Sequence, residues 1–116
     1  MKKYCYAAAL AVSLAAAMPA IGAEGGSCHF HGSKLTTEAI VIGCANGRRD
    51  ALVSGGKLDK AWQTVRHEKI ELVDGKKGKE WKVTFKDPTA KDAAKQTLYL
   101  FFTPPGNFIA ANFTGQ

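Results

Sequence analysis

The residues best suited to chemistry lie close together in the stretch Cys28-His29-Phe30-His31, and Cys44 follows further along the chain. Thiolate and imidazole groups bind copper and zinc, so four such donors suit tetrahedral zinc or a thiolate copper(I) site. Two imidazoles alone would bind copper(II) or zinc weakly, with water or a carboxylate completing the ligand set. The sequence therefore indicates a candidate metal site at His29 and His31, which Cys28 and Cys44 would join if their thiols are reduced.

A disulfide would compete for the same two sulfur atoms. Of the three cysteines, Cys5 lies near the N-terminus, so Cys28 and Cys44 form an even pair in the rest of the chain. An even number of cysteines in an oxidising compartment favours a disulfide. Closing a loop of about 17 residues would stabilise the fold by about 3 kcal/mol on the chain-entropy model. We expect a Cys28–Cys44 disulfide, and a thiolate metal site or free thiols remain the alternatives.

Catalytic motifs are absent from the sequence. It has no Gly-x-Ser-x-Gly elbow, no His-Glu-x-x-His zinc motif and no phosphate-binding loop. A nucleophile pair of Cys28 or Cys44 with His67 would need a reduced thiol outside the cytoplasm. His67 lies in a charged stretch and is expected at the surface. We therefore expect a protein that is not an enzyme, has no catalytic residues, and has no cofactor other than candidate copper or zinc.

The first residues have the three parts of a secretory signal peptide. Lys2 and Lys3 supply positive charge, residues 4–17 are small or apolar, and residues 19–23 supply small side chains for cleavage. The apolar run is shorter than the roughly 20 residues that a membrane-spanning helix needs. We expect residues 1–23 to be a signal peptide cut after Ala23, or one or three residues earlier. The mature protein would then be periplasmic and have no transmembrane anchor.

The formal charge of the chain is +6. A positive charge attracts nucleic acid, but an exported protein does not meet it, so we expect no nucleic-acid partner. The lysines are spread along the chain, except for Lys76, Lys77 and Lys79 around a glycine-containing turn. This cluster indicates a solvated hairpin tip, and the alternative is weak attraction to anionic lipid head groups or lipopolysaccharide.

The elements that position these residues follow from hydrophobic spacing. Residues 24–36 are glycine-rich and polar, which predicts a flexible Cys/His-containing lead-in to a single domain over residues 37–116. Thr36 and Thr37 offer an N-cap hydroxyl, and apolar residues at helical spacing predict one helix from about Thr37 to Val53, which Gly55-Gly56 ends. The competing interpretation is a short strand over residues 39–42 followed by a shorter helix.

Beyond Trp62 the period changes to that of strands. The predicted strands, turns and loop, in chain order, are a strand over 69–73, a turn over 74–78, a strand over 81–85, a loop over 87–95, a strand over 98–102, a turn over 104–107 and a strand over 108–113. Strands joined by short turns pair antiparallel. We therefore expect an α+β fold in which one main N-terminal helix packs on a three- to four-stranded antiparallel meander.

The strand over 98–102 is apolar on both of its faces. One helix covers only one face of a sheet, so either the lead-in or a partner must cover part of the other face. Because large exposed apolar patches mark interaction sites, this strand favours a binding module.

Two stretches support a resemblance to known proteins. They are residues 56–62, Gly-Lys-Leu-Asp-Lys-Ala-Trp, and the segment that runs from Glu80-Trp81 through Leu98–Phe102 to the closing Ala110-Ala111-Asn112-Phe113-Thr114-Gly115. The chain resembles a family of small exported bacterial proteins of unknown function, and its helix-then-meander order resembles that of PepSY-type domains. The resemblance implies an α+β fold, a periplasmic location and no established catalytic residues. PepSY-type domains are associated with inhibiting or chaperoning proteases. The resemblance implies such a role for this chain only by analogy of shape.

These observations lead to two functional hypotheses. The first is a non-enzymatic periplasmic binding module of PepSY-like type with an unknown protein partner. The alternative is a periplasmic protein that handles copper or zinc through the cluster Cys28-His29-Phe30-His31.

Overall fold

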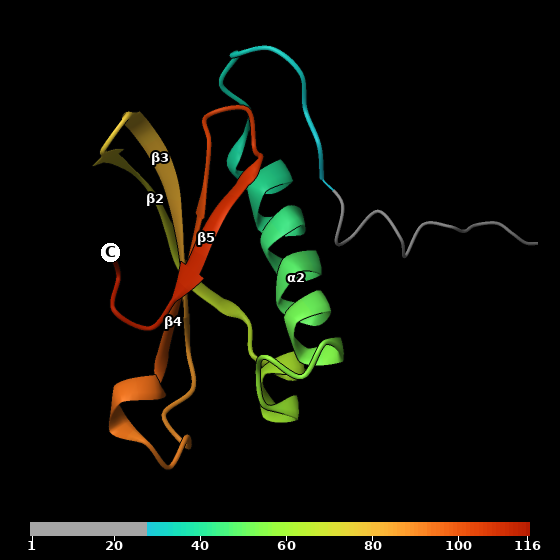
Figure 1. Cartoon of the computed structure of the whole chain (residues 1–116), viewed down its shortest axis with the longest axis vertical. Helices are drawn as coiled ribbons and strands as arrows, with labels where there is room; N and C mark the ends of the chain where they lie inside the picture. The colour runs from blue at the N-terminus through green and yellow to red at the C-terminus, as the bar shows by residue number, and fades with distance from the viewer. Residues whose placement is uncertain (1–27) are drawn as a thin grey trace, which may run out of the picture.

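A computed structural model describes residues 28–116 (Figure 1). The expected signal peptide and residues 24–27 of the lead-in lie outside the described residues. The elements follow in the order α2 (Glu38–Ser54), η2 (Lys60–Thr64), β2 (His67–Gly75), β3 (Gly78–Lys86), η3 (Ala93–Lys95), β4 (Thr97–Phe102) and β5 (Phe108–Asn112). No helix in this part of the chain is long and apolar enough to cross a membrane.

The strands form one four-stranded sheet in the order β2-β3-β4-β5, and every neighbouring pair is antiparallel. Helix α2 lies on one side of this sheet, beside β5 in the view of Figure 1. The predicted α+β fold, a helix packed on an antiparallel meander, is therefore confirmed, and the sheet has four strands.

Helix α2 begins and ends close to the predicted residues. The Thr37 hydroxyl accepts a hydrogen bond from the backbone N–H of Ile40 and caps the first turn. At the other end, the N–H of Gly55 donates to the carbonyl of Ala51, and Gly56 takes a positive φ of 78°. The competing interpretation, a strand over residues 39–42, is wrong because these residues form the first turns of the helix.

The core lies between α2 and the inner face of the sheet, which is the face towards the helix. Helix residues Val41, Cys44 and Ala45 are buried at helical spacing. The inner-face residues of the two central strands pair across the ladder as Trp81 with Phe102, Val83 with Leu100, and Phe85 with Leu98. These nine side chains belong to one hydrophobic cluster, so burial against the sheet holds the helix in place.

A buried arginine joins the far end of α2 to the chain that leads into β2. Arg49 is 9% exposed, and its guanidinium donates to the carbonyl of Val65 and to the Asp50 carboxylate. The same group lies 5.7 Å from the centre of the Phe85 ring. Arg49 is thus a structural residue whose charge is paired and hydrogen-bonded, as a buried charge must be.

The first hairpin is longer than the sequence predicts. Strand β2 runs from His67 to Gly75, and Gly75 pairs with Gly78, so only Lys76 and Lys77 form the turn. Gly78 has a φ of 130°, which favours glycine. The hairpin therefore carries the strand ladder almost to its tip and places both turn lysines there.

Candidate functional site

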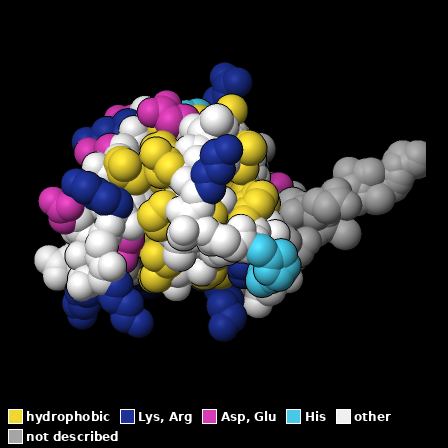
Figure 2. All heavy atoms as spheres, turned by 90° about the horizontal axis from the view of Figure 1, so that it is seen from above, with side chains coloured by type: hydrophobic (Ala, Val, Ile, Leu, Met, Phe, Trp, Pro, Cys, Tyr) yellow, Lys and Arg dark blue, Asp and Glu magenta, His cyan; other side chains and the backbone are white. Residues whose placement is uncertain are grey.

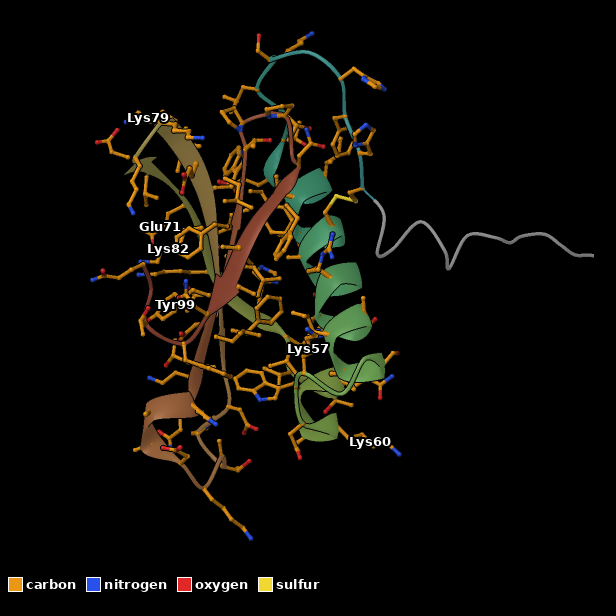
Figure 3. The ribbon with its side chains drawn as sticks, in the orientation of Figure 1. Lys57, Lys60, Glu71, Lys79, Lys82 and Tyr99 are labelled. Atoms are coloured by element: carbon orange, nitrogen blue, oxygen red, sulfur yellow. A yellow bond between two sulfur atoms is a disulfide. The ribbon has the colours of Figure 1, made fainter. Side chains whose placement is uncertain are left out.

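The sheet face that points away from α2, here called the open face, carries a second set of side chains. Strand alternation places Lys82 on this face of β3 and both Tyr99 and Phe101 on this face of β4. Figure 3 shows Glu71, Lys82 and Tyr99 together on the side of the sheet opposite the helix. Phe101 is only 6% exposed even though no helix covers it.

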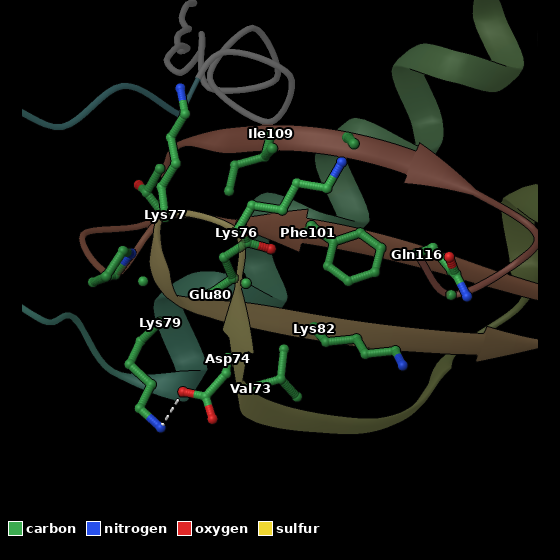
Figure 4. A pocket seen from close by; sticks show the side chains of 16 residues that line it. Val73, Asp74, Lys76, Lys77, Lys79, Glu80, Lys82, Phe101, Ile109 and Gln116 are labelled. Atoms are coloured by element: carbon green, nitrogen blue, oxygen red, sulfur yellow. Dashed lines mark ion pairs between the residues drawn. The ribbon is translucent and has the colours of Figure 1, made fainter.

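A hollow of about 890 Å³ lies on the open face, next to the first hairpin (Figure 4). We call it the basic hollow. Phe101 lies at its centre, and apolar side chains from β2 and β5, Val73 and Ile109, also line it. Its volume falls within the range of roughly 300–1,000 Å³ that is typical of ligand sites. Ile109 is 43% exposed, so part of this apolar lining is open to solvent.

Lysine side chains give the basic hollow its charge. Its lining includes Lys76, Lys77, Lys79 and Lys82 against two acidic residues, Asp74 and Glu80, a formal excess of two positive charges. Lys79 and Asp74 pair at 2.7 Å, but both side chains are exposed, so the pair is weak. The remaining positive charge is available to an anion that enters the hollow.

Lys82 connects this charge to the aromatic side chains. Its Nζ lies 4.8 Å from the centre of the Tyr99 ring and 6.0 Å from that of Phe101. A cation at such distances is attracted by the ring electrons, while the aliphatic part of the lysine covers apolar surface. Lys82 therefore presents a positioned positive charge directly above an apolar floor.

The last residues of the chain form another wall of the hollow. The Asn112 side-chain oxygen accepts hydrogen bonds from the backbone N–H groups of Thr114 and Gly115, which turns the chain back over the sheet. A side chain at position 115 would touch the Tyr99 ring at 3.3 Å, so Gly115 lies directly on that ring. The sequence indicated that the lead-in or a partner covers this face, and the structure shows that the C-terminal residues cover part of it.

The predicted chemical cluster lies on the other side of the molecule, at the N-terminal end of α2. A disulfide joins Cys28 to Cys44, as predicted, and their Cα atoms are 5.8 Å apart. The bond occupies both sulfur atoms, so neither serves as a thiolate ligand in this state. It also fixes the start of the described chain to the helix, as Figure 3 shows by the yellow bond.

His29 and His31 are exposed, and their ring centres are 4.9 Å apart. Figure 2 shows histidine side chains at the surface, next to the point where the described chain begins. Across residues 28–116, no three side chains of histidine, cysteine, aspartate or glutamate lie close enough together to hold a metal ion. His67 lies apart from this pair, at the start of β2.

Residues 28–36 form neither helix nor strand, yet Phe30 is firmly placed. Its backbone N–H donates to Oδ1 of Asn107 at 2.7 Å, and Nδ2 of Asn107 donates to its carbonyl at 2.9 Å. The Phe30 ring packs against Gly106, where an added Cβ would lie 3.0 Å from it. Nearby, the carbonyl of Pro104 accepts from both the Thr36 N–H and the Trp81 indole.

A second hollow, of about 590 Å³, lies between η2 and the loop before β4. Three aspartates line it, but the carboxylate of each accepts a hydrogen bond from a backbone N–H two residues later. The pairs are Asp59 with Ala61, Asp87 with Thr89, and Asp92 with Ala94. These acids stabilise local turns and 3-10 helices, so we assign them no chemistry.

Sequence reasoning identified the cysteines and histidines but not the roles of Lys82, Asn107 and Asn112. Lys82 belongs to no sequence motif. Its role depends on its position over the Tyr99 and Phe101 rings of the neighbouring strand. Asn107 follows Pro-Pro-Gly and was predicted only as part of a turn. One sequence feature did point to the open face, namely the apolar character of β4 on both of its faces. It predicts that other residues or a partner must cover Tyr99 and Phe101.

Comparison with known proteins gives a family but no activity. No curated protein and no solved structure matches this chain. A family described as of unknown function, DUF6488, matches residues 1–116, which is the full length of the chain. The chain therefore belongs to DUF6488, a family of unknown function.

Proposed function

We propose that this protein is an exported, non-enzymatic binding module that holds an anionic partner in the basic hollow. The observation that carries the proposal is the combination of an apolar floor at Phe101 with an excess of lysines around it. A partner segment with acidic groups and one large apolar side chain would complement both features. Apolar contact would supply affinity, and the lysines would orient the segment.

The residues around the hollow support binding rather than catalysis. Its titratable side chains are lysines and two carboxylates, and the hydroxyl of Thr103 has no histidine beside it in the lining. A hydroxyl nucleophile is commonly activated by an adjacent general base. The helix-then-meander order also supports the PepSY-like interpretation, in which the partner is a protein.

An acidic peptide tests this function. The probe is a blocked pentapeptide with one phenylalanine between two pairs of glutamates, and the readout is the amide chemical shifts of the labelled protein. We expect saturable shifts at residues of β3, β4 and β5 that line the hollow. Lys82→Glu should weaken binding about tenfold, because an attractive charge becomes a repulsive one. Added salt should weaken it further.

Lys86→Glu is the matched control for this experiment. Lys86 lies on the same strand and face as Lys82, is exposed, and lies outside the hollow. It changes the net charge equally, so its effect should stay within about twofold if the placement of the lysine matters. Equal weakening by both variants, or no saturable shift, would contradict the proposal. Binding only to vesicles of anionic phospholipid would instead indicate a membrane-binding surface.

Export is part of the same proposal. The charged start, apolar run and small residues of positions 1–23 support removal of a signal peptide. Protein recovered from the periplasm should have the intact mass of a chain that begins near Glu24. The same chain expressed without residues 1–23 is the control and should stay in the cytoplasm. An intact mass that includes Met1 to Ala23 would exclude processing at this site.

Metal handling is the second candidate function. The observation that favours it is the pair of exposed imidazoles, 4.9 Å apart, on a segment held by the disulfide. Imidazole is a common ligand of copper(II) and zinc. Because the disulfide occupies both sulfur atoms, no thiolate adds to the two imidazoles as a ligand. The metal would therefore exchange readily and would not be required for folding.

A further inference from the structure

We infer that His29 and His31 form a surface chelate for copper(II) whose geometry is held by Asn107. The inference rests on the metal-handling candidate and adds to it the residue that positions the ligands. Three contacts fix the segment that carries the histidines. Cys28 is bonded to Cys44, the backbone of Phe30 exchanges two hydrogen bonds with the Asn107 side chain, and the Phe30 ring packs on Gly106.

These contacts separate the side chains of the segment into two sets. Phe30 is partly buried against the hydrophobic core, whereas His29 and His31 on either side of it are exposed. The two imidazole rings lie next to each other on the solvent side of the segment, with their centres 4.9 Å apart. Fixing Phe30 inward therefore fixes both imidazoles outward and close together.

The spacing of the rings fits a shared ion. An ion bound at about 2.0–2.1 Å to one nitrogen of each imidazole, with a ligand angle of roughly 90–110°, places the ring centres about 4.5–5.3 Å apart. The observed distance is 4.9 Å. The rings meet edge to face at an interplanar angle of 88°, so rotation about the terminal side-chain torsion is needed to aim both nitrogens at one point.

The donor set selects the metal. Two imidazoles and water are nitrogen and oxygen ligands, for which copper(II) has the highest affinity among the divalent first-row metals. In the described part of the chain no carboxylate joins the pair to form a group of three ligands. We therefore expect copper(II) to bind more tightly than zinc, with one ion per chain.

Asn107 acts as a positioning residue and does not bind the metal. Without its side chain, the backbone of Phe30 loses both hydrogen bonds, and the imidazoles must be ordered when the ion binds. Ordering even one backbone residue has a free-energy cost large enough to weaken binding about tenfold. The number of nitrogen ligands should not change, because His29 and His31 are both still present.

Calorimetry with copper(II) chloride tests the site on the untagged protein as isolated from cells. We expect about one equivalent to bind. His29→Ala or His31→Ala should each weaken binding at least tenfold, since one imidazole remains. His67→Ala is the matched control and should leave binding unchanged, because His67 lies on β2.

Asn107→Ala tests the positioning role. It should weaken copper(II) binding about tenfold while the electron paramagnetic resonance spectrum still shows two nitrogen ligands. A thermal melt of the metal-free variant checks that it is folded, and Asn107→Asp, which keeps the oxygen that accepts from Phe30, should recover part of the affinity.

The outcomes separate the two claims. Absence of saturable copper(II) binding to the wild type, or binding that survives loss of both histidines, would overturn the site and the metal-handling function with it. If the histidine variants lose binding but folded Asn107→Ala binds as tightly as the wild type, only the positioning role of Asn107 is wrong.

Discussion

Replacing Cys28 and Cys44 together by serine should lower the thermal midpoint by roughly 10–20 °C. The disulfide closes a loop with a sequence separation of 16 residues. On the chain-entropy model, losing that restraint on the unfolded chain costs about 3 kcal/mol. For a domain of fewer than 100 residues, each kcal/mol shifts the midpoint by about 4–8 °C. Thermal unfolding followed by circular dichroism measures the change.

Reduction supplies the control for this variant. Dithiothreitol should lower the midpoint of the wild type to about that of the double-serine variant and should not affect the variant itself. A double-serine midpoint within about 2 °C of the oxidised wild type would mean that the bond adds little beyond the contacts of Phe30. A lowered midpoint in both the double-serine variant and the reduced wild type would identify the disulfide as a principal support of the segment that carries His29 and His31.

Phe85→Ala should cost about 3–5 kcal/mol of unfolding free energy, the largest effect that we expect from a single substitution. The Phe85 side chain is 0% exposed and lies between the sheet and α2, with Arg49 over its ring. Truncation leaves a cavity at the centre of the core, which fixed neighbours on both sides cannot fill. Because domains of this size are stable by only about 5–15 kcal/mol, urea denaturation should show a much lower midpoint.

Ile109→Ala is the control for the core substitution, because it removes a large apolar side chain from the open face. Ile109 is 43% exposed, so its truncation should cost less than about 1 kcal/mol. The contrast tests whether the helix side of the sheet supplies most of the stability. If Phe85→Ala and Ile109→Ala lowered the unfolding free energy equally, the helix side of the sheet would not supply most of the stability.

The two candidate sites can be tested independently because different elements carry them. The basic hollow is formed by the strands and the C-terminal residues on the open face, whereas the histidine pair lies in the segment that the disulfide joins to α2. Lys82→Glu should leave copper(II) binding unchanged, and His29→Ala should leave peptide binding unchanged. Both sites could operate in one protein, since neither uses a residue of the other.

Local sequence features were sufficient to predict most of the fold. Helix α2 was predicted from the two threonines that offer its N-cap, its apolar spacing and the two glycines that follow it, and the structure shows that Thr37 is the cap. The strands were predicted from alternation, which is a property of consecutive residues. The hairpin turn was predicted too long, because the two glycines that define its ends look the same in sequence whether they pair or lie free. The disulfide was predicted from the parity of the cysteines.

The sequence by itself determined the main helix, the strands, their order and the chemistry of the 28–31 segment, because each depends on residues that are close in the chain. Only the tertiary structure decided which residues meet. It placed Lys82 over rings from another strand, folded Gly115 onto Tyr99, and joined Phe30 to Asn107 across 77 positions of sequence. Such contacts follow from how the helix and the sheet pack as whole elements, and no local period or motif encodes them.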